Sequence, residues 1–505
     1  MKKLTVSANA PLPGIEHIVV LMFENRSFDN VLGTLYPPSA SFDGLPLDSS
    51  NTYIDPFKHT VTVTNTPPSG NAPVITPYPD PGESFHDMTK QIFGYNGSQV
   101  ADMSGFAQNY FDKHILTGKP GDIMFYFTPD QMPMTSFLAS NFAVCDQWFA
   151  SGPVQTFPNR MFCHCGTPGY HLHHLSGKLH AYLNDDDYIE DLLGSGMEMF
   201  AGKVKDKSIF ELLDGGDEPS EANWKVYFHD WPMSAINKYV NDAWNAKSPC
   251  VASYDDSDYN PPYGTSTFFD DVALDKLPAY AFIEPRYYDN YSGSGQSPNS
   301  NHPGSANYPP IGNPPIDVRN GELLLLFVYE TLCLFPSVFN KTLLIVTYDE
   351  HGGVYDHVPP NSSPFASTAV SPFPQTADNF NYDRYGVRVP AFFVNPMIPA
   401  NTIYRPAQPS SGAFYPCDHT TIIATLREQF GLTSTLTPRD AAAPWLTGLI
   451  STNNTPRSIE SLRVPASLKA WADSQPKLTG QPGTRLTPAE HERRMIEIIK
   501  GKAKR

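Results

Sequence analysis

The chain lacks any long hydrophobic run. Over 505 residues, no apolar stretch approaches the roughly 20 residues that a helix needs to cross a bilayer, so membrane contact is expected to be peripheral at most. Residues 1–14 contain two lysines but no apolar segment behind them, and no secretory signal is visible. On this N-terminus we expect a cytoplasmic protein, whereas a removed signal peptide would mean a secreted or periplasmic one.

Cysteine and positive charge are also scarce. The 6 cysteines are scattered, and the spacing of Cys163 and Cys165 is too short for the usual zinc pair, so we expect free, buried thiols. The 35 Lys and Arg residues against 52 Asp and Glu give a net charge of −17. This charge argues against a nucleic-acid partner, because phosphate backbones are bound by clustered Lys and Arg. A small phosphorylated substrate is still compatible, because a bound metal can reverse the sign of the charge locally.

The remaining composition is that of a large folded protein with shaped loops. Hydrophobic residues make up 40%, with 50 prolines and 34 glycines, and there is no internal repeat. Strand-like segments alternate with helical ones, which predicts an α/β fold with a mostly parallel central sheet flanked by helices. The expected organisation is an irregular lead-in, one large catalytic domain with long insertions or lid loops at about 170–207 and 289–317, and a polar extension with a basic helical tail, at residues 1–14, 15–450 and 451–505 respectively.

Two apolar runs end in polar side chains of one chemical kind. Residues 18–23 and 343–346 read as buried strands, and the carboxyl ends of parallel strands meet at one edge of a sheet. The residues that follow these runs are Glu24, Asn25, Asp349 and Glu350. Such hard oxygen ligands predict one divalent metal ion, with calcium, magnesium or manganese favoured. Neighbouring histidines leave zinc or iron open.

Thr156 is the candidate nucleophile. It precedes Phe157-Pro158, and proline is well tolerated at the start of a helix. A hydroxyl at a helix N-terminus beside a metal loses its proton more easily, and backbone N–H groups there bind phosphate oxygens. Asn159 and Arg160 could add side-chain donors, and nearby histidines could shuttle protons. The alternative is that Thr156 only caps the helix.

Six motifs occur in one order along the chain: ENRSFDNVLG, MSGFAQNY, WFASGPVQTFPNR, YDEHGGVYDHVPP, RYGVRVPAFFVNP and DHTT. Over most of residues 15–445 the chain therefore resembles the phosphoesterase family of bacterial and plant non-specific phospholipases C and some bacterial acid phosphatases. That family resembles the alkaline-phosphatase superfamily in fold. The resemblance implies a phosphothreonine intermediate on Thr156. It also implies a metal bound by the four residues at the two strand ends.

Further residues complete the predicted site. Those expected to act in catalysis beside Thr156 are His302 and His419. Those expected to bind substrate are Asn159, Arg160, His86 and Glu284. Those expected to support the metal ligands from behind are His351, Asp356, His357 and Asp418.

Two departures from the family pattern concern proton transfer and substrate choice. Where relatives tend to read DPGHSF, this chain reads DPGESFHD, so Glu83 stands at a histidine position and His86 lies three residues further on. A second histidine of the relatives corresponds here to Ile316-Asp317, after a longer loop.

The expected function is that of a metal-dependent phosphoric ester hydrolase. The most specific expectation is a non-specific phospholipase C that releases diacylglycerol and a phosphorylated head group. One alternative is an acid phosphatase acting on small phosphomonoesters, and another is a phospholipid- or phosphate-binding homologue with weakened catalysis. Sulfate or phosphonate esters are a third substrate class. The sequence decides neither the head group nor the oligomeric state.

Overall fold

The structure is a computed structural model that describes most of the chain. The residues that it describes are 4–67, 75–95, 97, 100–115, 117–172, 179–185, 187–188, 202–254, 267–287, 298–304, 316–360, 376, 378–407, 416–451, 453 and 455–475. Much of the two predicted insertions, and the whole basic tail, lie outside these residues.

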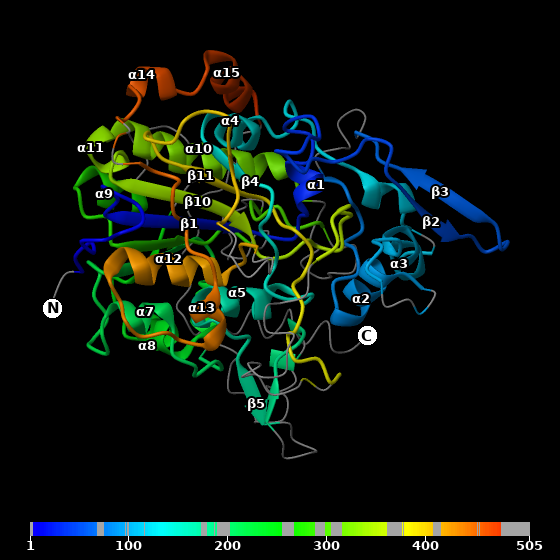
Figure 1. Ribbon diagram of the computed structural model, residues 1–505, viewed down its shortest axis with the longest axis horizontal. Coiled ribbons are helices and arrows are strands. Elements are labelled where there is room, and N and C mark those ends of the chain that lie inside the picture. Colours follow the sequence, from blue (N-terminus) through cyan, green and yellow to red (C-terminus); the bar gives the residue numbers. More distant parts are fainter. Residues whose placement is uncertain are drawn as a thin grey trace.

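One eight-stranded sheet forms the centre of the molecule (Figure 1). From edge to edge its strands are β12 (Thr402–Tyr404), β4 (Ala143–Cys145), β11 (Ala391–Val394), β10 (Thr342–Tyr348), β1 (His17–Phe23), β9 (Tyr280–Ile283), β7 (Trp224–Phe228) and β8 (Val251–Ser253). Within this sheet only β11 runs against the others. The predicted α/β fold with a mostly parallel sheet is therefore confirmed.

The two central strands are buried along their whole length. Every residue of β1 and β10 is buried, and both are continuous runs of mainly aliphatic residues. This composition is typical of parallel strands that are covered on both faces, since neither face needs polar residues.

Helices cover both faces of the sheet (Figure 1). On one face lie α4 (Pro133–Asn141), α9 (Thr267–Ala273), α10 (Val318–Leu334) and α11 (Pro336–Phe339). On the other face lie α5 (Thr156–Cys165), α7 (Ile209–Leu213), η3 (Met233–Ile236), α8 (Lys238–Asn245), α12 (Thr420–Phe430) and α13 (Pro438–Ala442). The start of the predicted polar extension packs on α10 through α14 (Ile459–Leu462) and α15 (Ala466–Ser474), where the Tyr329 hydroxyl donates to the carbonyl oxygen of Leu462 at 2.5 Å.

A smaller group of elements stands beyond one end of the sheet, at the right of Figure 1. It comprises α1 (Phe28–Val31), the hairpin β2–β3 (Ser50–Ile54 and Thr60–Thr64), α2 (Phe85–Phe93), α3 (Phe106–Lys113) and η2 (Pro120–Met124). A second hairpin is β5–β6 (Tyr170–Leu172 and Leu179–Ala181). The strand arrow of β10 points toward the first group, so the carboxyl ends of the parallel strands face it.

All six cysteines are free, and five of them are buried, as predicted. In the described part of the chain, no helix has both the length and the apolar character needed to cross a membrane.

Candidate active site

The structure brings the two predicted strand ends together. β1 and β10 are parallel neighbours, and their register pairs Phe23 with Tyr348, so the residues that follow lie side by side. The backbone N–H of Asn25 donates to Asp349 Oδ1 at 3.1 Å. Carboxylates from opposite ends of the chain therefore share one edge of the sheet.

Backbone geometry allows this close approach. Asn25 has a φ of 57°, in the left-handed region that asparagine tolerates better than most residues. The turn after β10 packs against it through Gly352, whose φ is 62°. A Cβ at Gly352 would lie only 2.3 Å from the carbonyl oxygen of Asn25, so this position needs glycine.

Thr156 reaches this edge from the first turn of α5. Its hydroxyl donates to Asn25 Oδ1 at 3.4 Å. The helix start is anchored by Asp185, whose Oδ1 accepts from the backbone N–H of Phe157 at 2.8 Å. A carboxylate stabilises a helix N-terminus. Asp185 is not among the residues predicted from the sequence, because its place in an acidic run does not show which helix it contacts.

The amide of Asn25 links the threonine to two further groups. Its nitrogen Nδ2 donates to Glu83 Oε1 at 2.6 Å and lies 3.1 Å from His302 Nε2. His302 Nδ1 lies 2.7 Å from the carbonyl oxygen of Pro303, which can only accept a hydrogen bond. The ring hydrogen is therefore on Nδ1, and Nε2 presents its lone pair toward Asn25.

Arg160 lies behind the carboxylates. Its Nε donates to Asp349 Oδ2 at 3.0 Å, and its guanidinium lies 5.2 Å from the centre of the Tyr287 ring. The side chain is 1% exposed, so it orients and charge-balances Asp349. Asn159 bonds the backbone of the preceding loop, including the carbonyl oxygen of Val154 at 2.7 Å. Contact of Arg160 and Asn159 with substrate stays a prediction.

Negative charge accumulates at this edge. Burial raises the pKa of Glu24, of Asp349 and of Glu350, because the charged form loses its hydration. Arg160 lowers the pKa of Glu24 and Asp349, whereas Glu83 raises that of Glu24 and Glu350 by repulsion. One arginine is thus shared among several buried carboxyl groups.

A cation fits this chemistry. Glu350 is fully buried, its Oε2 accepts from the backbone N–H of Gly352 at 2.6 Å, and its Oε1 has no hydrogen-bond partner among the described residues. The predicted ligands offer only oxygen atoms, which suits a hard divalent ion. The described residues bring three ligand-capable atoms within 4.8 Å of one another at two other places. The carboxylates of Glu24, Asp349 and Glu350 are not that close to one another.

The first of these clusters borders the candidate site. Asp80, Glu83 and His302 place ligand-capable atoms within 4.8 Å of one another. Glu83 and His302 contact the amide nitrogen of Asn25, so this cluster borders the amide whose oxygen accepts from Thr156.

The second cluster is an ion-pair network that contains the predicted supporting residues Asp356 and His357. Arg388 donates to Asp356 and to Asp29, each at 3.0 Å, and His357 Nδ1 lies 2.7 Å from Asp29. Although burial opposes its charge, hydrogen bonds to Asp29 and Asp43 raise the pKa of His357 to about 10. The arginine and the charged histidine balance these carboxylates, so this cluster needs no metal.

His419 contacts the site from behind. Its Nε2 donates to the carbonyl oxygen of Asp349 at 2.6 Å, and its Nδ1 accepts from Trp148 Nε1 at 3.3 Å. Burial lowers its pKa to about 4, so the ring is neutral at pH 7. With both ring nitrogens engaged, His419 is placed to position Asp349. Among the described contacts of the His419 ring, none reaches Thr156, so its catalytic role stays a prediction.

The two remaining supporting residues are also buried. Asp418 accepts from Arg439 Nη2 and from the Ser151 hydroxyl, each at 3.0 Å. His351 Nε2 lies 2.9 Å from Gln91 Oε1, and burial lowers its pKa to about 3. Both side chains therefore stabilise the segments that carry the site.

The other two predicted substrate-binding residues have their hydrogen-bond or ion-pair partners elsewhere, although the charge of Glu284 also acts on Arg160. Continuing the register of β9 with β1 places Glu284 level with Met22, below the edge of the sheet. There Glu284 is fully buried and accepts from the backbone N–H groups of Met233 and Ser234. His86 has a side chain that is 68% exposed and lies 3.4 Å from Asp378.

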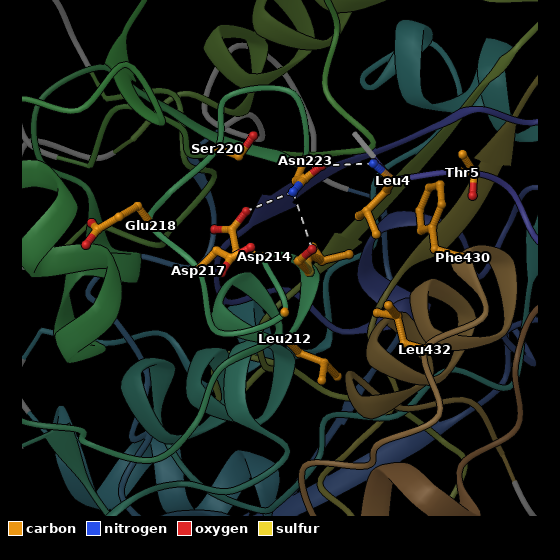
Figure 2. Close-up of a pocket in the computed structure, with 12 residues that line it drawn as sticks. Leu4, Thr5, Leu212, Asp214, Asp217, Glu218, Ser220, Asn223, Phe430 and Leu432 are labelled. Carbon is orange, nitrogen blue, oxygen red and sulfur yellow. Dashed lines mark hydrogen bonds between the residues drawn. The ribbon is translucent and has the colours of Figure 1, made fainter. Parts of the chain in front are cut away.

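A separate pocket lies near the opposite edge of the sheet, where Asn223 immediately precedes β7 (Figure 2). Its cavity volume is about 310 Å³. Asn223 accepts from the backbone N–H of Leu4 at 3.1 Å and donates to Asp214 at 3.0 Å, as Figure 2 shows. No predicted site residue lines this pocket, so it is distinct from the candidate active site.

Residues 15–433 match the sequence profile of the phosphoesterase family. The chain belongs to this family. Membership confirms the predicted resemblance and the predicted class, a hydrolase of phosphoric esters. The match includes every residue predicted for the site, from Glu24 to His419.

Relatives of this phosphoesterase occur in plants and bacteria. Non-specific phospholipase C5 of Arabidopsis thaliana is 32% identical, and the alignment covers 90% of this chain and 78% of the relative. Phospholipase C A of Mycobacterium tuberculosis is 25% identical, with 84% and 75% covered. Among solved structures, an alkaline phosphatase superfamily protein from Vibrio parahaemolyticus aligns at 11% identity with a TM-score of 0.34, covering 99% of this chain and 90% of that one.

Proposed function

We propose that this phosphoesterase is a phospholipase C that uses Thr156 as its nucleophile. The observation that carries the proposal is the hydrogen bond of the Thr156 hydroxyl to Asn25 Oδ1, at the edge where Glu24, Asp349 and Glu350 gather. The plant and mycobacterial relatives, whose names describe phospholipases C, support the substrate class. The products would be diacylglycerol and a phosphorylated head group.

The proposed reaction has two displacements. In the first, the Thr156 oxygen attacks phosphorus, the bond from phosphorus to the glycerol oxygen breaks, and diacylglycerol leaves with a proton. In the second, water attacks the same phosphorus, which releases the phosphorylated head group and restores the threonine hydroxyl. His302 Nε2 faces the same Asn25 amide that accepts the hydrogen bond of Thr156, so this nitrogen is the candidate for taking the threonine proton and delivering it to the leaving oxygen once substrate is bound.

The predicted metal fits the same arrangement. Glu24, Asn25, Asp349 and Glu350 would hold a divalent cation, which when bound supplies positive charge that favours the deprotonated form of a neighbouring hydroxyl. Arg160 and His419 fix the carboxylate and the carbonyl group of Asp349, so this residue is rigid before any ligand binds.

Substitution of the nucleophile tests the proposal. Thr156→Ala should lower turnover of phosphatidylcholine vesicles by about 10³-fold or more, because the covalent route is lost. Thr156→Ser should keep part of the activity, and Thr117→Ala, at an exposed threonine outside the site, should keep all of it. Quenching the wild-type reaction in acid should leave the phosphorylated head group on the peptide that contains Thr156. Full turnover by Thr156→Ala would refute the assignment.

A further inference from the structure

Glu83 lies next to the nucleophile without belonging to the predicted metal ligands. It immediately precedes the N-cap of α2, Ser84, and its side chain is only 10% exposed. Its Oε1 accepts from Asn25 Nδ2 at 2.6 Å, and Oδ1 of the same amide accepts from Thr156 at 3.4 Å. One side-chain amide therefore separates this carboxylate from the attacking oxygen.

One imidazole and a second carboxylate lie beside Glu83. His302 lies between two carboxylates, with Nδ1 at 3.8 Å from Asp80 and Nε2 at 3.7 Å from Glu83. The Glu83 carboxylate therefore adds a negative charge on the side of Asn25 where Thr156 also binds.

The carboxylate charge of Glu83 beside Thr156 affects two classes of phosphate ester differently. A phosphomonoester carries a charge of about −1.5 to −2 at pH 7, as phosphorylated side chains do, whereas a phosphodiester carries only one negative charge. Thr156 and Glu83 bind the same side-chain amide, that of Asn25. A phosphate group within reach of Thr156 therefore lies in the electrostatic field of the Glu83 carboxylate. Repulsion therefore penalises the monoester more than the diester.

We propose that Glu83 makes this site select phosphodiesters over phosphomonoesters. The inference rests on the proposed function, because it takes Thr156 as the attacking group. A preference for diesters would distinguish a phospholipase C from an acid phosphatase, the two activities expected from the sequence. The preference depends on the charge of the side chain at position 83, because a neutral or cationic side chain there would not repel the second negative charge of a monoester.

Isosteric neutralisation tests the inference. Glu83→Gln keeps an acceptor oxygen for Asn25 but removes the charge, and Glu83→His places an imidazole there. With bis(p-nitrophenyl) phosphate and p-nitrophenyl phosphate as substrates, the ratio of kcat/KM for diester over monoester should fall roughly tenfold or more in both variants. The fall should come from a lower KM for the monoester. Asp378→Asn, at the partner of the exposed His86, should leave the ratio unchanged.

A binding measurement accompanies the kinetics. Calorimetric titration with inorganic phosphate at pH 8, where it is a dianion, should show about tenfold tighter binding to Glu83→Gln than to the wild type. Circular dichroism would establish that each variant is folded. An unchanged ratio together with unchanged phosphate binding would overturn the inference, and so would an equal loss of both activities, since that result would assign Glu83 only to orienting Asn25. If the wild-type protein turns over neither ester, the proposed function fails, and the phosphate titration alone decides the inference.

Discussion

The charge on His357 predicts a stability that depends on pH. The residue lies in the network with Asp29, Asp43 and Arg388, and its pKa rises from 6.5 to about 10. A group whose pKa is raised on folding stabilises the folded state fully below its unfolded pKa, and that stabilisation is lost as the pH rises through the folded pKa. His357→Gln should therefore be destabilising at neutral pH and nearly neutral near pH 10.

The magnitude follows from the two pKa values. Linkage gives a lower free energy of unfolding for His357→Gln by about 4 kcal/mol at pH 7, by about 1.4 kcal/mol at pH 9 and by less than about 0.5 kcal/mol at pH 10. These figures are upper values, because the glutamine amide can still donate one hydrogen bond to Asp29 or Asp43.

Urea unfolding followed by tryptophan fluorescence between pH 6.5 and 10 would measure the difference. His59→Gln is a matched control, because His59 pairs with Asp55 at 3.2 Å but has a side chain that is 74% exposed, so its substitution should change stability little at any pH. A difference between wild type and His357→Gln that stays constant across this range would refute the reasoning. A negligible difference at pH 7 would refute it equally.

Two further predictions concern the active site. Dialysis against a chelator should abolish activity on phosphatidylcholine vesicles, and calcium, magnesium or manganese should restore it, because the predicted ligands are oxygen atoms. Full activity of a protein that elemental analysis shows to be free of metal would contradict the predicted cofactor. His419→Gln should weaken metal affinity about 10- to 100-fold, as the loss of a group that orients a metal ligand typically does, while the KM for substrate changes little. Competition with a fluorescent chelator measures the affinity, and an affinity equal to that of the wild type would exclude the positioning role of His419.

The sequence by itself determined the central sheet and the meeting of its two acidic ends. Continuous apolar runs report buried strands, and parallel strands must end at the same edge, so Glu24 and Asp349 could be placed together without coordinates. Thr156 at the first turn of α5 was equally accessible, because proline marks helix starts. The ordered motifs then indicated the family, which the match over residues 15–433 confirms.

The tertiary structure alone decided which polar side chains reach the site. Glu284 follows a strand in the same sheet, yet its register leaves it level with Met22 and buried under η3. His86 lies next to Phe85 in sequence, but Phe85 is buried whereas His86 faces outward on α2.

The same limit applies to partners that lie far apart along the chain. Asp185 contacts the nucleophile helix, and Arg388 rather than a metal balances Asp356. Sequence periodicity reports where strands and helices run and which face of each is apolar. It does not fix strand register, loop paths or the pairing of distant charges, since these are set by how all the elements pack together.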